Sequence, residues 1–338
     1  MKDFSVGIVS TGIYLPENCH DSAYIAQETG IPIEVIEKKF GIKRKPRAGD
    51  KDQSAYMAVK AAQKALDGHD PKEIDLLIWT GSEHKDFYVW SAGIKVQHEI
   101  GAQNAWAIDV AARCSTNIVA LKLVKDIMQS DPAINTVLLA GGHRTCDLIN
   151  YKNERARFLI NLSDGGSAIL LKKSHPANLV LGTSIITDGA FSEDVIIPAG
   201  GTRMPTSRET IERGLHFFDV PDPQGMKERL DKSSMRNFVK VIQEAVEKSG
   251  YKVEDIDYLA LLHMKRSAHD YILSELGLNQ SQSIYLDDYG HIGAPDQVLS
   301  LELASRQGKV KDGDLVVLAS AGIGYTWAAT VIKWGPAV

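Results

Sequence analysis

Ile74-Asp75-Leu76-Leu77-Ile78 follows the helical stretch Val59–Leu66, and the same order of features returns later in the chain, where Ile256-Asp257-Tyr258-Leu259-Ala260 follows Val239–Val246. Self-similarity at a fixed separation is the sequence signature of a repeated structural unit. We therefore predict that the chain contains two copies of one unit in which a helix precedes a buried strand.

A second pair of segments supports the duplication. Thr136–Gly141 is echoed by Leu315–Ser320 at nearly the same separation as the first pair. We expect an N-terminal half over residues 1–173 and a C-terminal half over residues 174–338. Residues 202–234 are rich in Pro, Gly and charge without a clear period, which predicts an insertion or cap within the second half.

Apolar, β-rich runs alternate with amphipathic stretches along most of the chain, which indicates an α/β fold with mixed, mainly parallel sheets. The predicted strands are Ser5–Thr11, Leu76–Thr80, Ala105–Asp109, Thr136–Ala140, Ser167–Leu171, Leu259–His263, Ser283–Leu286, Leu315–Ala319 and Thr330–Lys333. The predicted helices are Ser54–Leu66, Ser115–Met128, Met235–Lys248, His269–Glu275 and Pro295–Gly308.

Composition limits the classes of function. A chain of 338 residues with a net charge of −5 lacks the broad positive field of a non-specific nucleic-acid binder, so we expect no nucleic-acid partner. No apolar run reaches membrane-spanning length, and the first residues do not form the apolar region of a signal peptide. The three cysteines show no CxxC spacing, which favours a reducing cytoplasm and predicts neither a disulfide framework nor a metal site.

Cys114 has the best context for a nucleophile. It follows the predicted strand Ala105–Asp109 and precedes a helix beginning near Ser115, and reactive groups gather at such strand ends in α/β units. Unpaired N–H groups at a helix start favour a thiolate. The alternative is a buried structural cysteine, which is also our interpretation of Cys19 and Cys146.

Two histidines in the second half occupy similar positions. His263 ends the apolar run Leu259–Leu262, and His291 lies in Tyr289–Pro295, where glycines allow close backbone approach. Each histidine could instead be tied to a backbone carbonyl. Together with Cys114 they provide a nucleophile and two groups that bind a thioester oxygen or handle a proton, a set that suits acyl transfer.

The ordered segments resemble the β-ketoacyl-acyl-carrier-protein synthase III group of thiolase-fold condensing enzymes over nearly the whole chain. The segments that carry the resemblance are Gly12–Glu17, Phe40–Arg44, Asp109–Cys114, Asp164–Ala168, Pro198–Gly201, Tyr289–Gly290 and Gly322–Trp327.

This resemblance implies a duplicated five-layer α-β-α-β-α fold, a homodimer, and transfer of an acyl group to Cys114 from coenzyme A or an acyl carrier protein. A malonyl-type thioester would then lose carbon dioxide and condense with the acyl group to give a β-ketoacyl product. The thioesters are substrates, and no other cofactor is implied.

The catalytic set departs from the family pattern. The family has Cys-His-Asn, whereas this chain has His263 at the histidine position and His291 where the asparagine stands. The resulting Cys-His-His set is similar to that of the elongating synthases I and II, in which two histidines bind the thioester carbonyl.

Other implied roles involve the backbone and the substrate pocket. The resemblance implies an oxyanion site made by backbone N–H groups of Cys114, Ile323 and Gly324, with Ile323 standing where the family has glycine. Gly322 belongs to the same turn and is expected to border the substrate.

Three further positions concern substrate binding. Val35 and Lys39 stand where the family often has the tryptophan and arginine that hold the adenine of coenzyme A. Trp90 lies in the region that shapes the acyl pocket and the dimer contact in relatives, and a role in the core or interface fits it equally.

Two other functions remain open at this level. The acyl-cysteine could pass its acyl group to an amine, a hydroxyl or a non-malonyl thioester, with a histidine as the base. Alternatively, the chain could be a catalytically silent thiolase-fold subunit that stabilises a partner enzyme.

Overall fold

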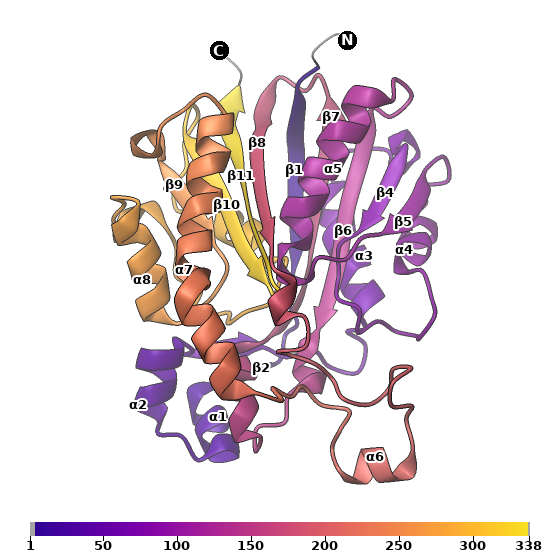
Figure 1. The fold of residues 1–338 in the computed structure, drawn as a ribbon. Helices are drawn as coiled ribbons and strands as arrows, with labels where there is room; N and C mark the ends of the chain where they lie inside the picture. Colours follow the sequence, from indigo (N-terminus) through magenta and orange to yellow (C-terminus); the bar gives the residue numbers. More distant parts are fainter. Residues whose placement is uncertain (1–3, 337–338) are drawn as a thin grey trace.

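The computed structural model describes residues 4–336, which form one nine-stranded sheet in the order β5-β4-β6-β7-β1-β8-β11-β10-β9 and a small β2-β3 sheet (Figure 1). The strands are β1 Val6–Tyr14, β2 Cys19–Asp21, β3 Arg44–Pro46, β4 Leu76–Trp79, β5 Trp106–Asp109, β6 Thr136–Arg144, β7 Asp164–Lys173, β8 Ala177–Thr187, β9 Tyr258–Leu261, β10 Leu315–Gly322 and β11 Thr326–Pro336.

Helices cover both faces of the sheet. They are α1 Ser22–Thr29, α2 Ile33–Val35, α3 Ser54–Ala65, α4 Ala92–Ile100, α5 Thr116–Ser130, α6 Arg208–Glu212, α7 Pro223–Lys248, α8 Arg266–Glu275 and α9 Asp296–Arg306, with a π-helix η1 at Ile36–Phe40. Two 3₁₀ segments matter for the site, η3 Arg113–Ser115 and η5 Glu154–Asn161. In no part of residues 4–336 is a helix long and apolar enough to cross a bilayer.

The strand pairing repeats between the two halves. Strand β4 pairs parallel with β6, and β6 pairs antiparallel with β7; in the second half β9 pairs parallel with β10, and β10 pairs antiparallel with β11. The strands that the sequence repeat matched are thus equivalent in topology. Parallel pairing occurs in the outer strands, whereas the central strands pair antiparallel. The halves meet at β1 and β8 through the pair Gly7 and Leu179.

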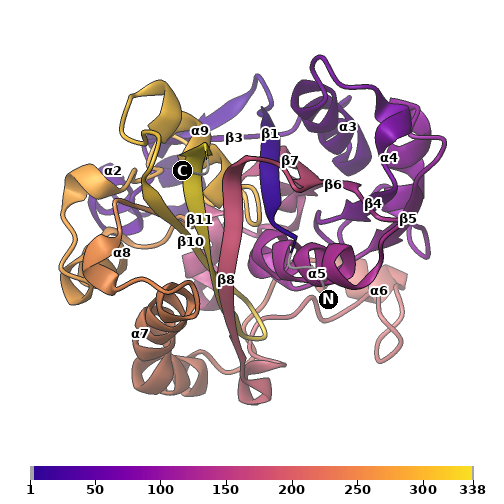
Figure 2. The same ribbon diagram turned by 90° about the horizontal axis from the view of Figure 1, so that it is seen from above.

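Three clusters of buried apolar side chains fill the spaces between the helices and the strands. One lies between α3, α4 and the first-half strands, and another lies between α7, α8 and the second-half strands. The largest joins α5 and α9 with strands of both halves. Viewed from above, α3 and α4 lie on the outside of the first half and α7 and α8 on the outside of the second (Figure 2). The layers are thus α3 and α4, the first-half strands, α5 and α9, the second-half strands, and α7 and α8, which is the predicted five-layer arrangement. The site lies at the buried starts of the central helices α5 and α9.

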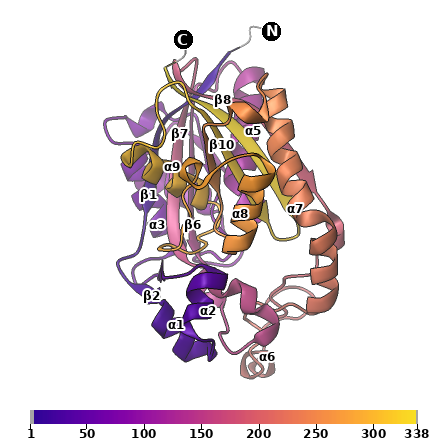
Figure 3. The same cartoon turned by 90° about the vertical axis from the view of Figure 1, so that its left-hand side faces the viewer.

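Residues 223–234, predicted to belong to an irregular insertion or cap, form the first turns of α7, which Pro223 starts and the Asp222 side chain caps. The irregular part is limited to the excursion that carries α6, which extends beyond the sheet at the same end as α1 and α2 (Figure 3).

The predicted strand Ser283–Leu286 was wrong. The segment lies beside β9, where the Ser283 hydroxyl donates to the carbonyl oxygen of Leu259 at 2.7 Å, but it has no strand structure. The side-chain bond takes the place of a ladder contact, so β9 is the last strand of the sheet.

Candidate active site

Cys114 lies in the short 3₁₀ turn η3 between β5 and α5, and its side chain is partly exposed. The Thr116 hydroxyl accepts from the N–H of Ala112 and donates to the carbonyl of Arg113. The Ser320 hydroxyl, from β10, donates to the Cys114 carbonyl at 2.8 Å. These bonds hold the thiol in a fixed position between the two halves.

His291 reaches the sulfur directly. Its Nε2 atom lies 3.1 Å from Sγ of Cys114, and its Nδ1 atom lies 2.6 Å from Oδ2 of Asp296. Asp296 is fully buried at the first turn of α9, and it also accepts from the backbone N–H groups of Ile292 and His263. The three side chains therefore form a chain of nucleophile, imidazole and carboxylate, in which the carboxylate fixes the orientation of the ring.

The surroundings of His291 favour its charged form. Burial alone would lower the pKa of His291, but the charges of Cys114 and Asp296 and the hydrogen bonds to both raise this pKa well above 6.5. An imidazolium beside a cysteine sulfur stabilises the thiolate, which is the nucleophilic form.

The ring of His263 contacts a backbone carbonyl, as the alternative interpretation of the sequence allowed. Its Nε2 atom lies 2.9 Å from the carbonyl oxygen of Gly41, and its Nδ1 atom lies 3.2 Å from Nδ2 of Asn161. Burial lowers the pKa of His263 to about 4, so the ring is neutral near pH 7. The two rings therefore differ in their partners: His291 bonds to Cys114, whereas the His263 ring is bonded to Gly41 and Asn161.

The turn after β10 approaches the nucleophile. A Cβ added at Gly322 would lie 2.5 Å from the carbonyl oxygen of Ala112 and 3.1 Å from the backbone nitrogen of Cys114. Gly322 thus allows the Gly322–Gly324 turn to lie against the Cys114 turn, and Gly324 is exposed beyond it. The backbone groups predicted for an oxyanion site are in neighbouring segments.

Two of the three residues expected at the substrate, Trp90 and Lys39, lie at the periphery. Trp90 is half-buried, makes an edge-on contact with Phe87 at 5.6 Å and packs against the cluster under α3 and α4. Lys39 is exposed in the π-helix η1, next to Phe40 and Gly41. Gly41 in turn contacts His263, which connects η1 to the site.

The other cysteines have no catalytic setting. Cys146 is buried, its thiol lies 3.4 Å from the carbonyl of Leu162, and burial raises its pKa. Cys19 is exposed on β2. Within residues 4–336, no cluster of three or more potential metal ligands was found.

Two residues of the site were missed from the sequence. Asp296 stands five positions after His291 and at a helix start, so the spacing held a signal that could have identified it. Asn161 is separated from His263 by 102 residues, and no local pattern marks it.

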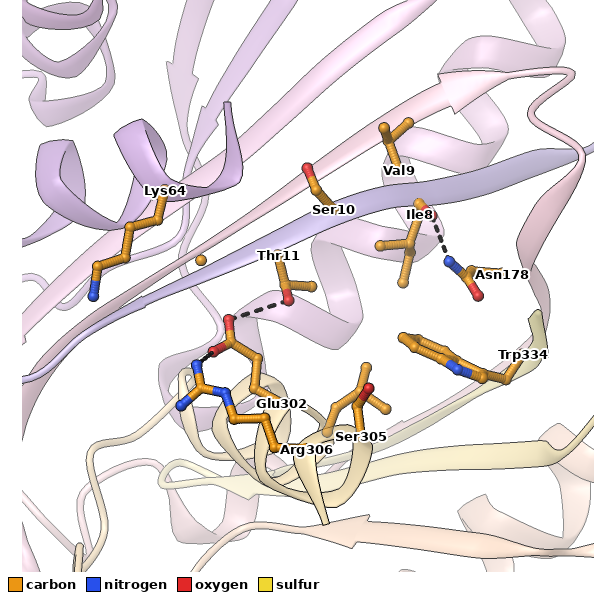
Figure 4. A pocket seen from close by; sticks show the side chains of 12 residues that line it. Ile8, Val9, Ser10, Thr11, Lys64, Asn178, Glu302, Ser305, Arg306 and Trp334 are labelled. Atoms are coloured by element: carbon orange, nitrogen blue, oxygen red, sulfur yellow. Dashed lines mark hydrogen bonds and ion pairs between the residues drawn. The ribbon is translucent and has the colours of Figure 1, made fainter. Parts of the chain in front are cut away.

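A groove of about 390 Å³ lies elsewhere, between β1, β8 and α9. There Glu302 accepts from Thr11 and pairs with Arg306 (Figure 4). Ser10, Lys64 and Asn178 in the same groove bond to backbone carbonyls. The groove contains none of the three residues of the Cys114 chain.

Comparisons with known proteins agree with this fold. Residues 108–189 match the family model described as 3-oxoacyl-[acyl-carrier-protein] synthase III, and residues 246–334 match its C-terminal model. The first model includes Cys114, and the second includes His263, His291 and Asp296.

Proteins that are similar to this chain over nearly its whole length carry the same family name. The β-ketoacyl-[acyl-carrier-protein] synthase III of Caldanaerobacter subterraneus is 29% identical over 98% of this chain and 99% of its own, and that of Clostridioides difficile is 29% identical over 97% and 98%. The solved 3-oxoacyl-[acyl-carrier-protein] synthase III of Aquifex aeolicus has a TM-score of 0.82 at 24% identity, covering 97% of this chain and 100% of its own. The chain therefore belongs to the 3-oxoacyl-[acyl-carrier-protein] synthase III family of thiolase-fold condensing enzymes.

Proposed function

We propose that the protein makes β-ketoacyl thioesters by decarboxylative condensation through an acyl group carried on Cys114. The observation that carries this proposal is the hydrogen-bonded chain Cys114–His291–Asp296, in which a buried carboxylate orients an imidazole that contacts an accessible thiol. Relatives named β-ketoacyl-[acyl-carrier-protein] synthase III support the substrate class, with an acyl carrier protein as carrier.

In the first step the Cys114 sulfur attacks the carbonyl carbon of an acyl thioester. The tetrahedral oxyanion accepts hydrogen bonds from the backbone N–H of Cys114 and from the Gly322–Gly324 turn, where Ile323 and Gly324 supply the donors. Collapse of this intermediate breaks the bond to the leaving thiol and leaves the acyl group on Cys114. The leaving thiolate takes the proton of the His291 imidazolium, so charge is balanced.

In the second step a malonyl-type thioester replaces the departed thiol. Breaking its bond to the carboxylate releases carbon dioxide and leaves the electron pair as an enolate. The enolate carbon attacks the acyl carbonyl, and the intermediate expels the Cys114 thiolate. The neutral His291 ring then takes a proton from solvent, which restores the starting pair of thiolate and imidazolium. Donors at the malonyl carbonyl stabilise the enolate in a buried setting.

Substrate access is proposed from the two peripheral residues. Lys39, as an exposed cation on η1, is suited to the phosphates of coenzyme A or of the carrier-protein arm. Trp90, which packs under α4, forms one wall of the acyl pocket. A reactive thiol at Cys114 requires a reducing compartment, and we place the enzyme in the cytoplasm.

We also propose that the enzyme is a homodimer. Strand β5 is the edge of the nine-stranded sheet, and its Trp106 is 48% exposed. Nearby, Phe87, Tyr88 and Val89 of the preceding loop are 68% to 90% exposed, and Ile94 of α4 is 55% exposed. An apolar edge with unpaired backbone groups is a template for pairing with a second copy.

One observation favours a second candidate function. Because Asp296 accepts the Nδ1–H of His291, the neutral ring would present the Nε2 lone pair toward the acyl group. Such a base could deprotonate a hydroxyl or amine acceptor, and the acyl group would move without loss of carbon dioxide. The names of the relatives support condensation and not this transfer.

The test is to load Cys114 with an acyl group, remove excess donor, and add a malonyl thioester. Condensation predicts carbon dioxide and β-ketoacyl product in equal amounts as the acyl mass disappears. Loss of the acyl mass to an alcohol or amine acceptor, with no carbon dioxide from malonyl thioester, would replace the proposal with the second candidate.

A further inference from the structure

Asn161 contacts both histidines of the site. It ends η5, it is half-buried, and its backbone carbonyl accepts from the N–H of His291 at 2.8 Å. Its side-chain Nδ2 atom lies 3.2 Å from Nδ1 of His263. The residue therefore connects the two segments that carry the histidines.

The hydrogen bonds of His263 determine how the amide is turned. A carbonyl oxygen only accepts, so the Nε2 atom facing Gly41 must carry the proton. The ring is neutral near pH 7, so Nδ1 is a bare acceptor. The atom of Asn161 that faces Nδ1 must then be the NH₂ nitrogen, and its amide plane is fixed.

Among the described residues, this arrangement leaves one N–H of Asn161 unbonded and uses the only N–H of the His263 ring. His263 spends its only N–H on Gly41, so it has none for a substrate carbonyl. The Asn161 amide has two N–H groups, and the described residues provide a hydrogen-bond partner for one of them, at His263. The second N–H is available on a partly exposed side chain next to His291.

We propose that this second N–H of Asn161 donates to the carbonyl of the malonyl-type thioester and stabilises the enolate, with His263 as the residue that positions the amide. The inference rests on the proposed condensation. The family has an asparagine at the position of His291, so this chain has no amide there. The inference assigns the amide donor to Asn161, a residue of the first half.

Lys45 holds the segment that carries Asn161. Its fully buried amine donates to the carbonyl oxygens of Ile160 and Leu162, at 2.7 and 2.6 Å. These carbonyls flank Asn161 on both sides, and Ser163 donates its N–H to the His291 carbonyl. The backbone of residues 160–163 is thus fixed relative to His291, as a donor that must meet a developing charge requires.

The two steps of the reaction separate this role from a structural one. In Asn161→Leu and in the near-isosteric Asn161→Asp, acylation of Cys114 by an acyl thioester should stay within about threefold of wild type, because it uses the backbone donors near Cys114. Carbon dioxide release from malonyl thioester should fall by about 100-fold, the usual effect of removing one such donor.

The positioning role of His263 is tested by coupling. His263→Leu should also slow carbon dioxide release. Adding Asn161→Leu to it should cause little further loss, because both changes disable the same donor, the second N–H of Asn161. The matched control is Asn153→Leu, which removes the cap of the same η5 segment. It should lower the unfolding midpoint and leave both steps within about twofold of wild type.

Each outcome has one interpretation. If wild type releases carbon dioxide and Asn161→Leu releases it equally fast, Asn161 is not the donor, while the condensation stands. If acylation and decarboxylation fall together in both Asn161 variants, the residue is structural and the inference is wrong. If wild type is acylated but releases no carbon dioxide, the proposed function fails and the inference fails with it.

Discussion

Asp296 accepts a hydrogen bond from the His291 ring at 2.6 Å, and the same Oδ2 atom accepts from the backbone N–H of His263 at 2.8 Å. One buried carboxylate thus orients the imidazole that touches the nucleophile and anchors the segment of the other histidine. Its place at the N-terminus of α9 stabilises its charge.

Replacing Asp296 should therefore disable the nucleophile. Asp296→Asn keeps the shape of the side chain but removes the charge that favours the His291 imidazolium and its Nδ1–H. We expect the rate of Cys114 acylation to fall on the order of 100-fold to 10,000-fold, as for carboxylates in comparable triads. Single-turnover mass spectrometry measures this rate, and one within threefold of wild type would show that Asp296 does not act through His291.

The neutral state of His263 predicts an acid-sensitive stability. Its pKa is lowered from 6.5 to about 4, so the unfolded chain binds a proton in this range that the native state does not. The stabilisation is fully present above pH 6.5 and is lost as the pH falls toward 4, and it amounts to roughly 3 kcal/mol.

Between pH 6.5 and 4, the free energy of unfolding should therefore change less in His263→Gln than in wild type. The difference corresponds to the uptake of up to one proton when the wild-type chain unfolds. Urea unfolding at several pH values measures the difference. Parallel curves for the two proteins over this range would mean that His263 is already protonated in the native state.

Gly322→Ala should move the nucleophile. The added Cβ would approach the Ala112 carbonyl to 2.5 Å, which forces the turn carrying Cys114 to shift. We expect a loss of about 1–3 kcal/mol in stability and at least tenfold slower acylation. Gly189→Ala is the control, because its Cβ would meet no atom within 4 Å; equal acylation in both variants would contradict the close approach.

The exposed edge predicts the oligomeric state. Trp106→Lys places a charge on β5 and should convert the homodimer to a monomer in light scattering. Tyr271→Lys, on the exposed surface of α8, should leave the dimer intact. A wild-type protein that is monomeric at micromolar concentration would exclude the proposed pairing.

The sequence repeat predicted the architecture because duplicated units keep the order of their buried strands. The pattern of apolar runs was wrong at Ser283–Leu286, where a side-chain bond from Ser283 to Leu259 stands in place of a backbone ladder. The long strand β8, Ala177–Thr187, was not predicted, and its partly exposed residues give little apolar alternation.

The sequence predicted only part of the site, because some of its contacts depend on the tertiary fold. Cys114 stands between a strand end and a helix start, and His291 stands shortly before a helix start, which local sequence shows. The orientation of His263 depends on Gly41, 222 residues away, and on Asn161 in the other half. A bond between two such distant segments leaves no spacing signal, so the tertiary fold alone determines which histidine reaches the sulfur.

The acyl-enzyme itself is the most direct test of this account. The purified protein should be incubated with a panel of acyl thioesters and its intact mass and peptides measured, with Cys114→Ala and Cys146→Ala alongside. We predict one acyl group per chain, on the peptide containing Cys114, in wild type and Cys146→Ala and none in Cys114→Ala. Full acyl mass on Cys114→Ala would contradict the account.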